Sequence, residues 1–224
     1  MRSAAFAIGA IALLGAGCFG SEETPFPPGL EPLEETNLAS PPAGTPEDPF
    51  PEVLSMTRAM VGPRTKSVHA IGFVHRPLAD VWEALRDPDV GADRRTFARW
   101  STTADVEPEY DFSYVIHSVI EMVITVEYDV TWRHGVIEGT VEAPIFVSAR
   151  YQKTDGSTVI QRLEGGVLLR EVEPGITRVE IIEYLRTING SEHDAIESFL
   201  QDMFAELVIR ARGEPLPPID ELRP

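Results

Sequence analysis

Between residues 110 and 186 the chain is a succession of short segments in which apolar and polar residues alternate. In segment 123–134, five alternate positions put apolar side chains on one face: Ile124, Val126, Tyr128, Val130 and Trp132. Alternation with period two is the pattern of a β-strand that has one buried and one wet face. The pattern predicts strands at 67–75, 110–119, 123–134, 145–153, 158–163, 167–172 and 177–186. Such a run is typical of an antiparallel sheet.

Pairs of turn-forming residues separate several of these strands. Asp155-Gly156 predicts a hairpin turn, and Pro174-Gly175 precedes the last strand. Gly165-Gly166 is interpreted as a further turn between two short strands, because nothing around it would place a helix N-terminus for phosphate binding.

Two helices are predicted beside the sheet. Pro77 opens the first, at a position where a missing N–H costs nothing, and Asp87-Pro88 ends it. The second follows a capping-box-like start at Ser191 and runs to Arg212, before Gly213. It has a wide apolar face: Ile196, Phe199, Leu200, Met203, Phe204, Leu207 and Val208. Residues 89–100 are ambiguous, and a short helix ending near Trp100 is the interpretation.

The order of strand, helix, several antiparallel strands and a long terminal helix predicts an α+β architecture. Segment 76–85, RPLADVWEAL, and segment 163–179, which contains LEGG and PGITRV, are similar to two parts of the START-like, or SRPBCC, superfamily. These parts are its strand-to-first-helix segment and its late hairpin. The resemblance covers about residues 66–212. It implies a helix-grip fold, in which a curved antiparallel sheet of about seven strands wraps around the long C-terminal helix and leaves a hydrophobic cavity.

The N-terminus predicts export and membrane anchoring. Residues 4–16 are apolar or small, and this stretch is shorter than the roughly 20 residues of a membrane span, as in a signal peptide. The residues before Cys18 resemble the lipobox of bacterial lipoproteins, which implies cleavage before Cys18 and acylation of it. Gly15 stands where the usual pattern has Leu, and the alternative is an ordinary secretory signal. Phe19 follows the cysteine. By resemblance to the sorting rule of enterobacterial lipoproteins, this residue implies that the protein is located in the cell envelope, at the outer membrane.

The composition then divides the chain into four parts. Residues 1–17 are a lipoprotein signal peptide, 18–57 an acidic Pro-rich tether, 58–213 a START-like/SRPBCC domain and 214–224 a Pro-rich tail. Residues 19–57 contain nine prolines and eight acids without Lys or Arg, a composition too poor in apolar residues to fold. Fully extended, they would reach roughly 120 Å. The tail is interpreted as solvated or as a strap over the surface.

Charge and motifs exclude several classes of function. The chain carries 19 Lys+Arg and 36 Asp+Glu, a net charge of −17, whereas nucleic-acid binding requires a basic face. The five histidines lack the spacing of a helical metal site and are interpreted as surface or strand-end residues. The sequence has no P-loop, nucleophile elbow or dinucleotide-binding glycine pattern. No cofactor and no metal are therefore expected.

Aromatic residues on the expected inner face are candidates for a ligand cavity. The candidates are Phe112, Tyr114, Tyr128, Trp132 and Tyr151 from the strands, with Phe199, Met203 and Leu207 from the last helix. The alternative is that these side chains simply fill the core. In strand 110–119 the opposite orientation would place Val115 and His117 inside.

Glu183 is the one charged candidate. It is in register with Val179, Ile181 and Leu185, so strict alternation points it inward, where a carboxyl group would have a raised pKa and serve as an acid or base. The alternative, which we favour from the sequence, is a bulge or strand end that turns it toward water.

Three functions fit these observations. The first is a lipid-anchored extracytoplasmic domain that binds a hydrophobic small molecule or lipid between the sheet and the C-terminal helix. The second, implied by the superfamily, is an enzyme of the polyketide cyclase/dehydrase type, for which Glu183, Tyr114 and His117 are the residues to inspect. The third is a protein–protein adaptor with a filled core. The absence of a catalytic motif favours the first.

Overall fold

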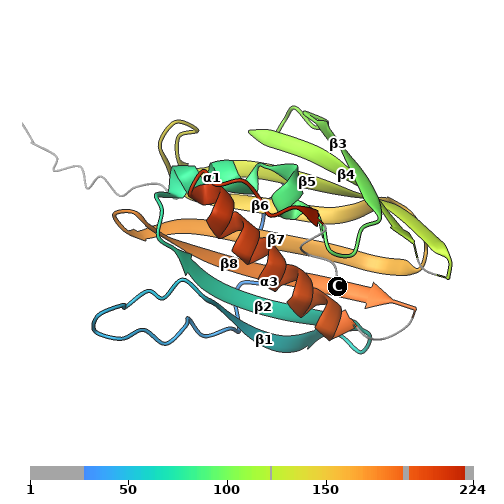
Figure 1. Cartoon of the computed structure of the whole chain (residues 1–224), viewed down its shortest axis with the longest axis horizontal. Coiled ribbons are helices and arrows are strands. Elements are labelled where there is room, and N and C mark those ends of the chain that lie inside the picture. Colours follow the sequence, from blue (N-terminus) through green and yellow to red (C-terminus); the bar gives the residue numbers. More distant parts are fainter. Residues whose placement is uncertain (1–27, 122, 189–191, 220–224) are drawn as a thin grey trace, which may run out of the picture.

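The alternating segments form one antiparallel sheet of eight strands, and a long helix crosses one of its faces (Figure 1). The computed structural model describes residues 28–121, 123–188 and 192–219. The strands are β1 (Leu54–Val61), β2 (Thr65–Val74), β3 (Arg99–Ala104), β4 (Phe112–Glu121), β5 (Thr125–Gly139), β6 (Pro144–Gly156), β7 (Ile160–Glu173) and β8 (Ile176–Thr187). Their order is β1-β2-β8-β7-β6-β5-β4-β3. The α+β arrangement predicted from the sequence is confirmed, with eight strands in place of about seven.

Two strands that the sequence did not predict, β1 and β3, lie at the edges of the sheet. β3 is almost entirely exposed, so its residues show no apolar alternation. The ambiguous stretch holds the short helix α2 (Pro88–Gly91), and the chain is already in β3 at Trp100. β1 begins at Leu54, inside the predicted tether, so the boundary at residue 57 is wrong. An edge strand pairs on one side only and needs little apolar patterning.

β7 is one continuous strand and not two strands joined by a turn. Gly165 and Gly166 lie in its middle, opposite Tyr151 and Arg150 of β6. A Cβ atom on Gly165 would overlap the ring of Tyr151. Gly165 is therefore required for the close approach of the Tyr151 ring. Close approach of another group is a common reason for glycine inside a strand.

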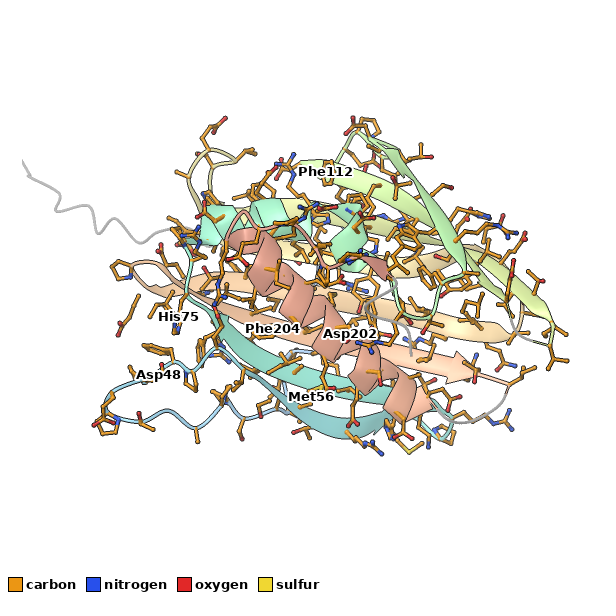
Figure 2. The ribbon with its side chains drawn as sticks, in the orientation of Figure 1. Asp48, Met56, His75, Phe112, Asp202 and Phe204 are labelled. Atoms are coloured by element: carbon orange, nitrogen blue, oxygen red, sulfur yellow. The ribbon has the colours of Figure 1, made fainter. Side chains whose placement is uncertain are left out.

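Two helices pack on the inner face of the sheet. In α1 (Leu78–Leu85) the predicted apolar stripe is buried, and Pro77 precedes its first residue. The long helix α3 (Glu192–Ala211) lies against α1, β2 and β8. The predicted cap at Ser191 lies outside the described residues. Phe204 of α3 points toward β2 (Figure 2), where Gly72 leaves the room: a Cβ there would lie 2.7 Å from the Phe204 ring.

A buried ion pair connects α3 to the segment after α2. Arg94 donates to Glu206 over 2.7 Å, and both side chains are less than a tenth exposed. The second amino group of Arg94 donates to the carbonyl of Pro217 over 2.9 Å. Residues 214–219 therefore cross the surface as a strap, the second of the two interpretations of the tail.

Residues 30–39 of the predicted tether are packed on the outer face of the sheet. Leu30 is fully buried and lies against Gly135, and the Leu30 carbonyl accepts a hydrogen bond from Ser148 Oγ over 2.7 Å. Further along, Asn37 Nδ2 donates to the Ala70 carbonyl over 3.0 Å. The prediction that this segment cannot fold is wrong for residues 30–39. A segment without regular secondary structure can be held on a sheet by hydrogen bonds from polar side chains of the sheet to its backbone carbonyls, as Ser148 holds Leu30.

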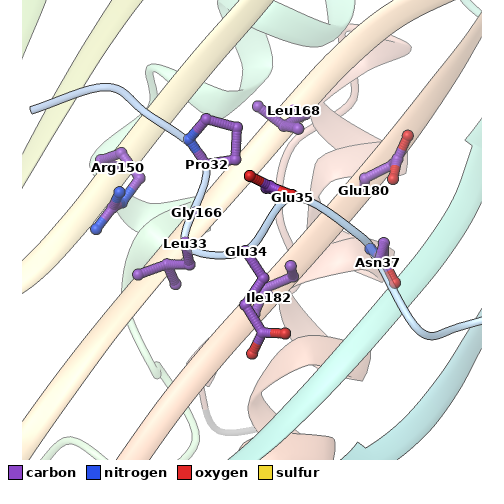
Figure 3. Close-up of a pocket in the computed structure, with 10 residues that line it drawn as sticks. All are labelled: Pro32, Leu33, Glu34, Glu35, Asn37, Arg150, Gly166, Leu168, Glu180 and Ile182. Carbon is purple, nitrogen blue, oxygen red and sulfur yellow. The ribbon is translucent and has the colours of Figure 1, made fainter. Parts of the chain in front are cut away.

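The packed segment leaves one small gap above the sheet. The space has a volume of about 60 Å³ and lies between Pro32, Glu35 and Asn37 of the segment and the sheet beneath them; Figure 3 shows Arg150 and Glu180 of the sheet at opposite ends of it. Cys18 and the predicted signal peptide lie outside the described residues. Among the residues that are described, no helix has both the length and the apolar character needed to cross a bilayer.

Candidate functional site

A row of inward-facing positions crosses the sheet from β4 to β8. Tyr114 of β4 is paired with Trp132 of β5, and Trp132 with Tyr151 of β6. Tyr151 is paired with Gly165 of β7, and Gly165 with Glu183 of β8. Directly paired residues of antiparallel strands project from the same face, so these five positions are lateral neighbours.

The aromatic members of this row stack on one another. The rings of Tyr114 and Trp132 are 5.8 Å apart with an interplanar angle of 8°, and those of Trp132 and Tyr151 are 4.2 Å apart with an angle of 21°. Tyr151 then extends over Gly165, which has no side chain, and its hydroxyl donates a hydrogen bond of 2.6 Å to Glu183 Oε2. The glycine thus allows two residues on non-adjacent strands to meet.

Glu183 is buried, contrary to the interpretation favoured from the sequence. Only 3% of the residue is exposed, because no bulge interrupts the pairing of β8 with β2 or β7 at this position. Burial raises the pKa of Glu183 to about 8; the hydrogen bond from Tyr151 opposes this shift and the nearby charge of Asp93 adds to it. At neutral pH this carboxyl group is mostly protonated.

The Glu183–Tyr151 pair opens into a cavity of about 310 Å³. The walls come from the segment 91–97, five strands of the sheet and the first turns of α3. Most lining side chains are aliphatic or aromatic, including Phe97, Ile120, Val126, Tyr128, Val130, Trp132, Ile160, Leu163, Leu185 and Phe199. The volume lies at the lower end of the roughly 300–1,000 Å³ typical of small-molecule sites.

Five of the nine predicted cavity residues surround this space. They are Tyr128, Trp132, Tyr151, Glu183 and Phe199. Burial raises the pKa of the Tyr128 and Tyr151 hydroxyls, so both remain protonated hydrogen-bond donors at neutral pH.

The other four predicted residues do not line the cavity. Tyr114 is covered by α2, where a Cβ on Gly91 would lie 2.8 Å from its hydroxyl. Met203 and Leu207 are buried in the core, because α3 rests directly on the sheet and α1 beyond its first turns. Phe112 is the first residue of β4 (Figure 2), and the Arg86 guanidinium carbon lies 4.6 Å from the centre of its ring. The cavity therefore lies near the N-terminus of α3, whereas Phe112 lines a separate hollow at the C-terminal end of this helix, with Arg86 and Arg210.

Two histidines are buried, which corrects the interpretation of all five as surface or strand-end residues. His134 lies among the rings of Phe112, Tyr114 and Trp132, and burial lowers its pKa to about 3. His69 is also fully buried, on the outer face of the sheet. His117 is exposed and bonded to Asp129 over 2.7 Å, so the alternative orientation of strand 110–119 is wrong. Within the described ranges no three metal-ligating side chains cluster.

Asp93 is a polar lining residue that sequence reasoning missed. It lies in residues 89–100, where apolar residues show neither the spacing of a strand nor that of a helix. Its Oδ1 accepts a hydrogen bond of 3.0 Å from the Thr96 backbone N–H. Burial raises the pKa of this carboxyl group as well. Leu163 and Leu185 could have been found, because Leu185 shares the register of Glu183 and is paired with Leu163.

No protein-family model matches the sequence, and no curated protein matches it. Solved structures do match. Human StAR-related lipid transfer protein 5 is 10% identical, with 73% of this chain and 84% of that chain covered and a TM-score of 0.51. The chain has the START-like helix-grip fold.

Two further structures are similar to this helix-grip domain. The lipid transfer and protein localization domain of human StarD13 is 14% identical, with coverage of 73% of this chain and 86% of that one and a TM-score of 0.49. The Zhui aromatase/cyclase from Streptomyces sp. R1128 is 11% identical, with coverage of 66% and 92% and a TM-score of 0.42. At such identities the likeness concerns the fold alone.

Proposed function

We propose that this helix-grip domain binds a hydrophobic small molecule or lipid in the cavity between the sheet and the start of α3. The observation that carries the proposal is the 310 Å³ space, whose walls are mainly aliphatic and aromatic and whose polar groups converge at Glu183 and Tyr151. A few placed polar groups in an apolar cavity are typical of a site that orients a ligand. The lipid-transfer name of a structural neighbour agrees with this function.

Blocking the cavity mouth should abolish binding without unfolding the domain. Ala195 is an exposed residue of α3 that lines the cavity, so Ala195→Trp would fill the entrance from a position with room outside the core. Fluorescence titration with neutral N-phenyl-1-naphthylamine should show binding to the wild type and a loss of about ten-fold or more in affinity for the variant. Ala205→Trp, on an exposed position of the same helix away from the cavity, is the control and should bind normally. Equal binding by all three proteins would contradict the proposed site.

We further propose that acylated Cys18 anchors the protein in the cell envelope, at the outer membrane. Support comes from the lipobox-like sequence and from the net charge of −17, which disfavours electrostatic binding to anionic lipids. Cys18→Ala should abolish incorporation of labelled palmitate and move the protein from the membrane fraction to the soluble fraction, because two or more acyl chains give durable anchoring. Unchanged fractionation of the variant would contradict the anchor.

An enzyme of the cyclase/dehydrase type is the second candidate, and one observation favours it. Glu183 and Tyr151 form a carboxyl–hydroxyl pair inside the cavity, and a pKa of about 8 is close to the working range of a general acid or base. Mass spectrometry of a bound ligand before and after incubation separates the two functions. Loss of water from the ligand, abolished by Glu183→Gln, would establish the enzyme, whereas unchanged ligand would support the binding protein.

The adaptor hypothesis has less support. The interior is not filled, and the outer face over β2 and β5–β8 is partly covered by residues 28–39 of the chain itself. Large apolar side chains that are exposed, such as Leu38 and Met60, do not share one element.

A further inference from the structure

Among the described residues, the cavity is lined by acidic and neutral polar groups and by no basic group. Two lining side chains, Asp93 and Glu183, are carboxylic acids, and none of the described residues around the cavity is a Lys, Arg or His. The remaining polar groups there are hydroxyls and an indole, which are neutral. A charged ligand group that enters this space therefore meets acids and no base.

The carboxyl group of Glu183 also has capacity for a further partner. Tyr151 donates to Oε2, and no described residue forms a hydrogen bond with Oε1. Since 97% of Glu183 is buried, a partner for Oε1 would have to come from within the cavity that it lines.

Aromatic rings surround the same space. Tyr128, Trp132 and Tyr151 approach it from the sheet, and Phe97 from the segment after α2. Trp132 is stacked between Tyr114 and Tyr151, so its faces are covered by these rings. The aromatic lining therefore supplies apolar contact for the body of a ligand, and the Glu183 carboxyl group is the group that can pair with a cation.

On this basis we propose that the ligand is a hydrophobic amine, an apolar body with one basic nitrogen that pairs with the Glu183 carboxylate. The inference rests on the proposed ligand-binding function and defines its ligand class. If the amine arrives neutral, it takes the proton from Glu183, and no proton is released. If it arrives as an ammonium ion, the Glu183 proton passes to solvent. Both routes end with the same ion pair.

The same walls disfavour anionic lipids. A fatty-acid carboxylate or a lipid phosphate would be buried near two acids with no lining base to pair with, and an unpaired buried charge is strongly destabilised. A neutral ligand avoids this penalty but gains nothing from ionisation of Glu183. The expected order of affinity is therefore amine, then neutral analogue, then acid.

Three probes with one apolar body test this order. They are 2-(1-naphthyl)ethylamine, 2-(1-naphthyl)ethanol and the 1-naphthylacetate anion, titrated calorimetrically at pH 7 against the wild-type protein. We expect the amine to bind about ten-fold more tightly than the alcohol, and the acid most weakly. Glu183→Gln should reduce amine affinity about ten-fold and leave alcohol affinity unchanged. Glu180→Gln, on the outer face of the same strand, is the matched control and should change neither.

The outcomes distinguish the inference from the function on which it rests. If the alcohol binds as tightly as the amine and Ala195→Trp abolishes both, the cavity binds ligands but the amine preference is wrong. If tight binding of the acid is sensitive to Ala195→Trp, the charge argument is overturned. If none of the probes, N-phenyl-1-naphthylamine included, binds in a manner sensitive to Ala195→Trp, the proposed function itself fails. The wild-type comparison does not depend on the folding of a Glu183 variant.

Discussion

Replacing Gly165 with alanine should destabilise the domain by about 2–6 kcal/mol, although the substitution adds a single methyl group. The new Cβ would occupy the space of the Tyr151 ring, so the ring must move away from its stacked position on Trp132. Overpacking of this kind costs about 1–3 kcal/mol, and the buried Glu183 carboxyl group would lose its hydrogen bond, at about 1–3 kcal/mol more. Urea unfolding monitored by circular dichroism measures the change.

The neighbouring glycine provides the control for this substitution. Gly166 is on the same strand but on the outer face, where an added Cβ would lie 3.1 Å from Cδ of Arg150, a side chain that donates hydrogen bonds to the Gly165 and Glu31 carbonyls. Gly166→Ala should cost less than Gly165→Ala, about 1 kcal/mol, since Arg150 needs to shift by only a few tenths of an ångström. If both substitutions lower the free energy of unfolding by similar amounts, Gly165 is needed for its backbone conformation and not to make room for the Tyr151 ring.

The second large effect is the dependence of stability on pH. In the unfolded chain Glu183 has an ordinary pKa of 4.5, whereas burial raises the pKa of the folded group to about 8. Below pH 4.5 both states are protonated, and between the two pKa values only the unfolded state releases the proton. Stability therefore falls as pH rises through this interval, by about 3–5 kcal/mol in total.

Glu183→Gln should remove this decline, because the amide does not ionise and still accepts a hydrogen bond from Tyr151. We expect the two proteins to have similar free energies of unfolding near pH 4.5, and the variant to be more stable by about 3 kcal/mol or more near pH 8.5. Asp93, Tyr128 and Tyr151 face this group and are retained in the variant, so the difference between the two curves isolates Glu183. Parallel pH curves would mean that the Glu183 carboxyl group reaches water.

Most of the fold could be predicted from the sequence because apolar residues recur at a fixed spacing in buried strands and in packed helices. Segment 123–134 shows this most clearly, and α1 begins after Pro77 as predicted. β3 could not be predicted, since an exposed edge strand does not need apolar residues at alternate positions. The packed segment around Leu30 was missed for a different reason. Composition measures the capacity to form a core, and this segment is held by hydrogen bonds to an existing sheet.

The site was only partly predictable. Alternation alone placed Glu183 inward, but a preference for water around a carboxylate argued against it. The buried Glu183 carboxyl group accepts a hydrogen bond from the Tyr151 hydroxyl. This contact between strands requires the register of β6, β7 and β8, which the sequence does not show. The cavity position depends on how closely α3 approaches the sheet, and a helix sequence with one apolar face does not specify that distance.

The packing of Leu30 on the sheet has a consequence for how far from a membrane the domain can work. If Cys18 is the anchor, as proposed, only the eleven residues 19–29 lie between it and Leu30, and the distance that they can bridge is at most about 40 Å. A free segment up to residue 57 would allow about three times that distance. In that case the docked segment would confine the cavity to a thin layer next to the bilayer, where it would exchange ligand with molecules at the lipid surface. Release of the segment from β5 and β6 would enlarge the radius of action without any change in the cavity.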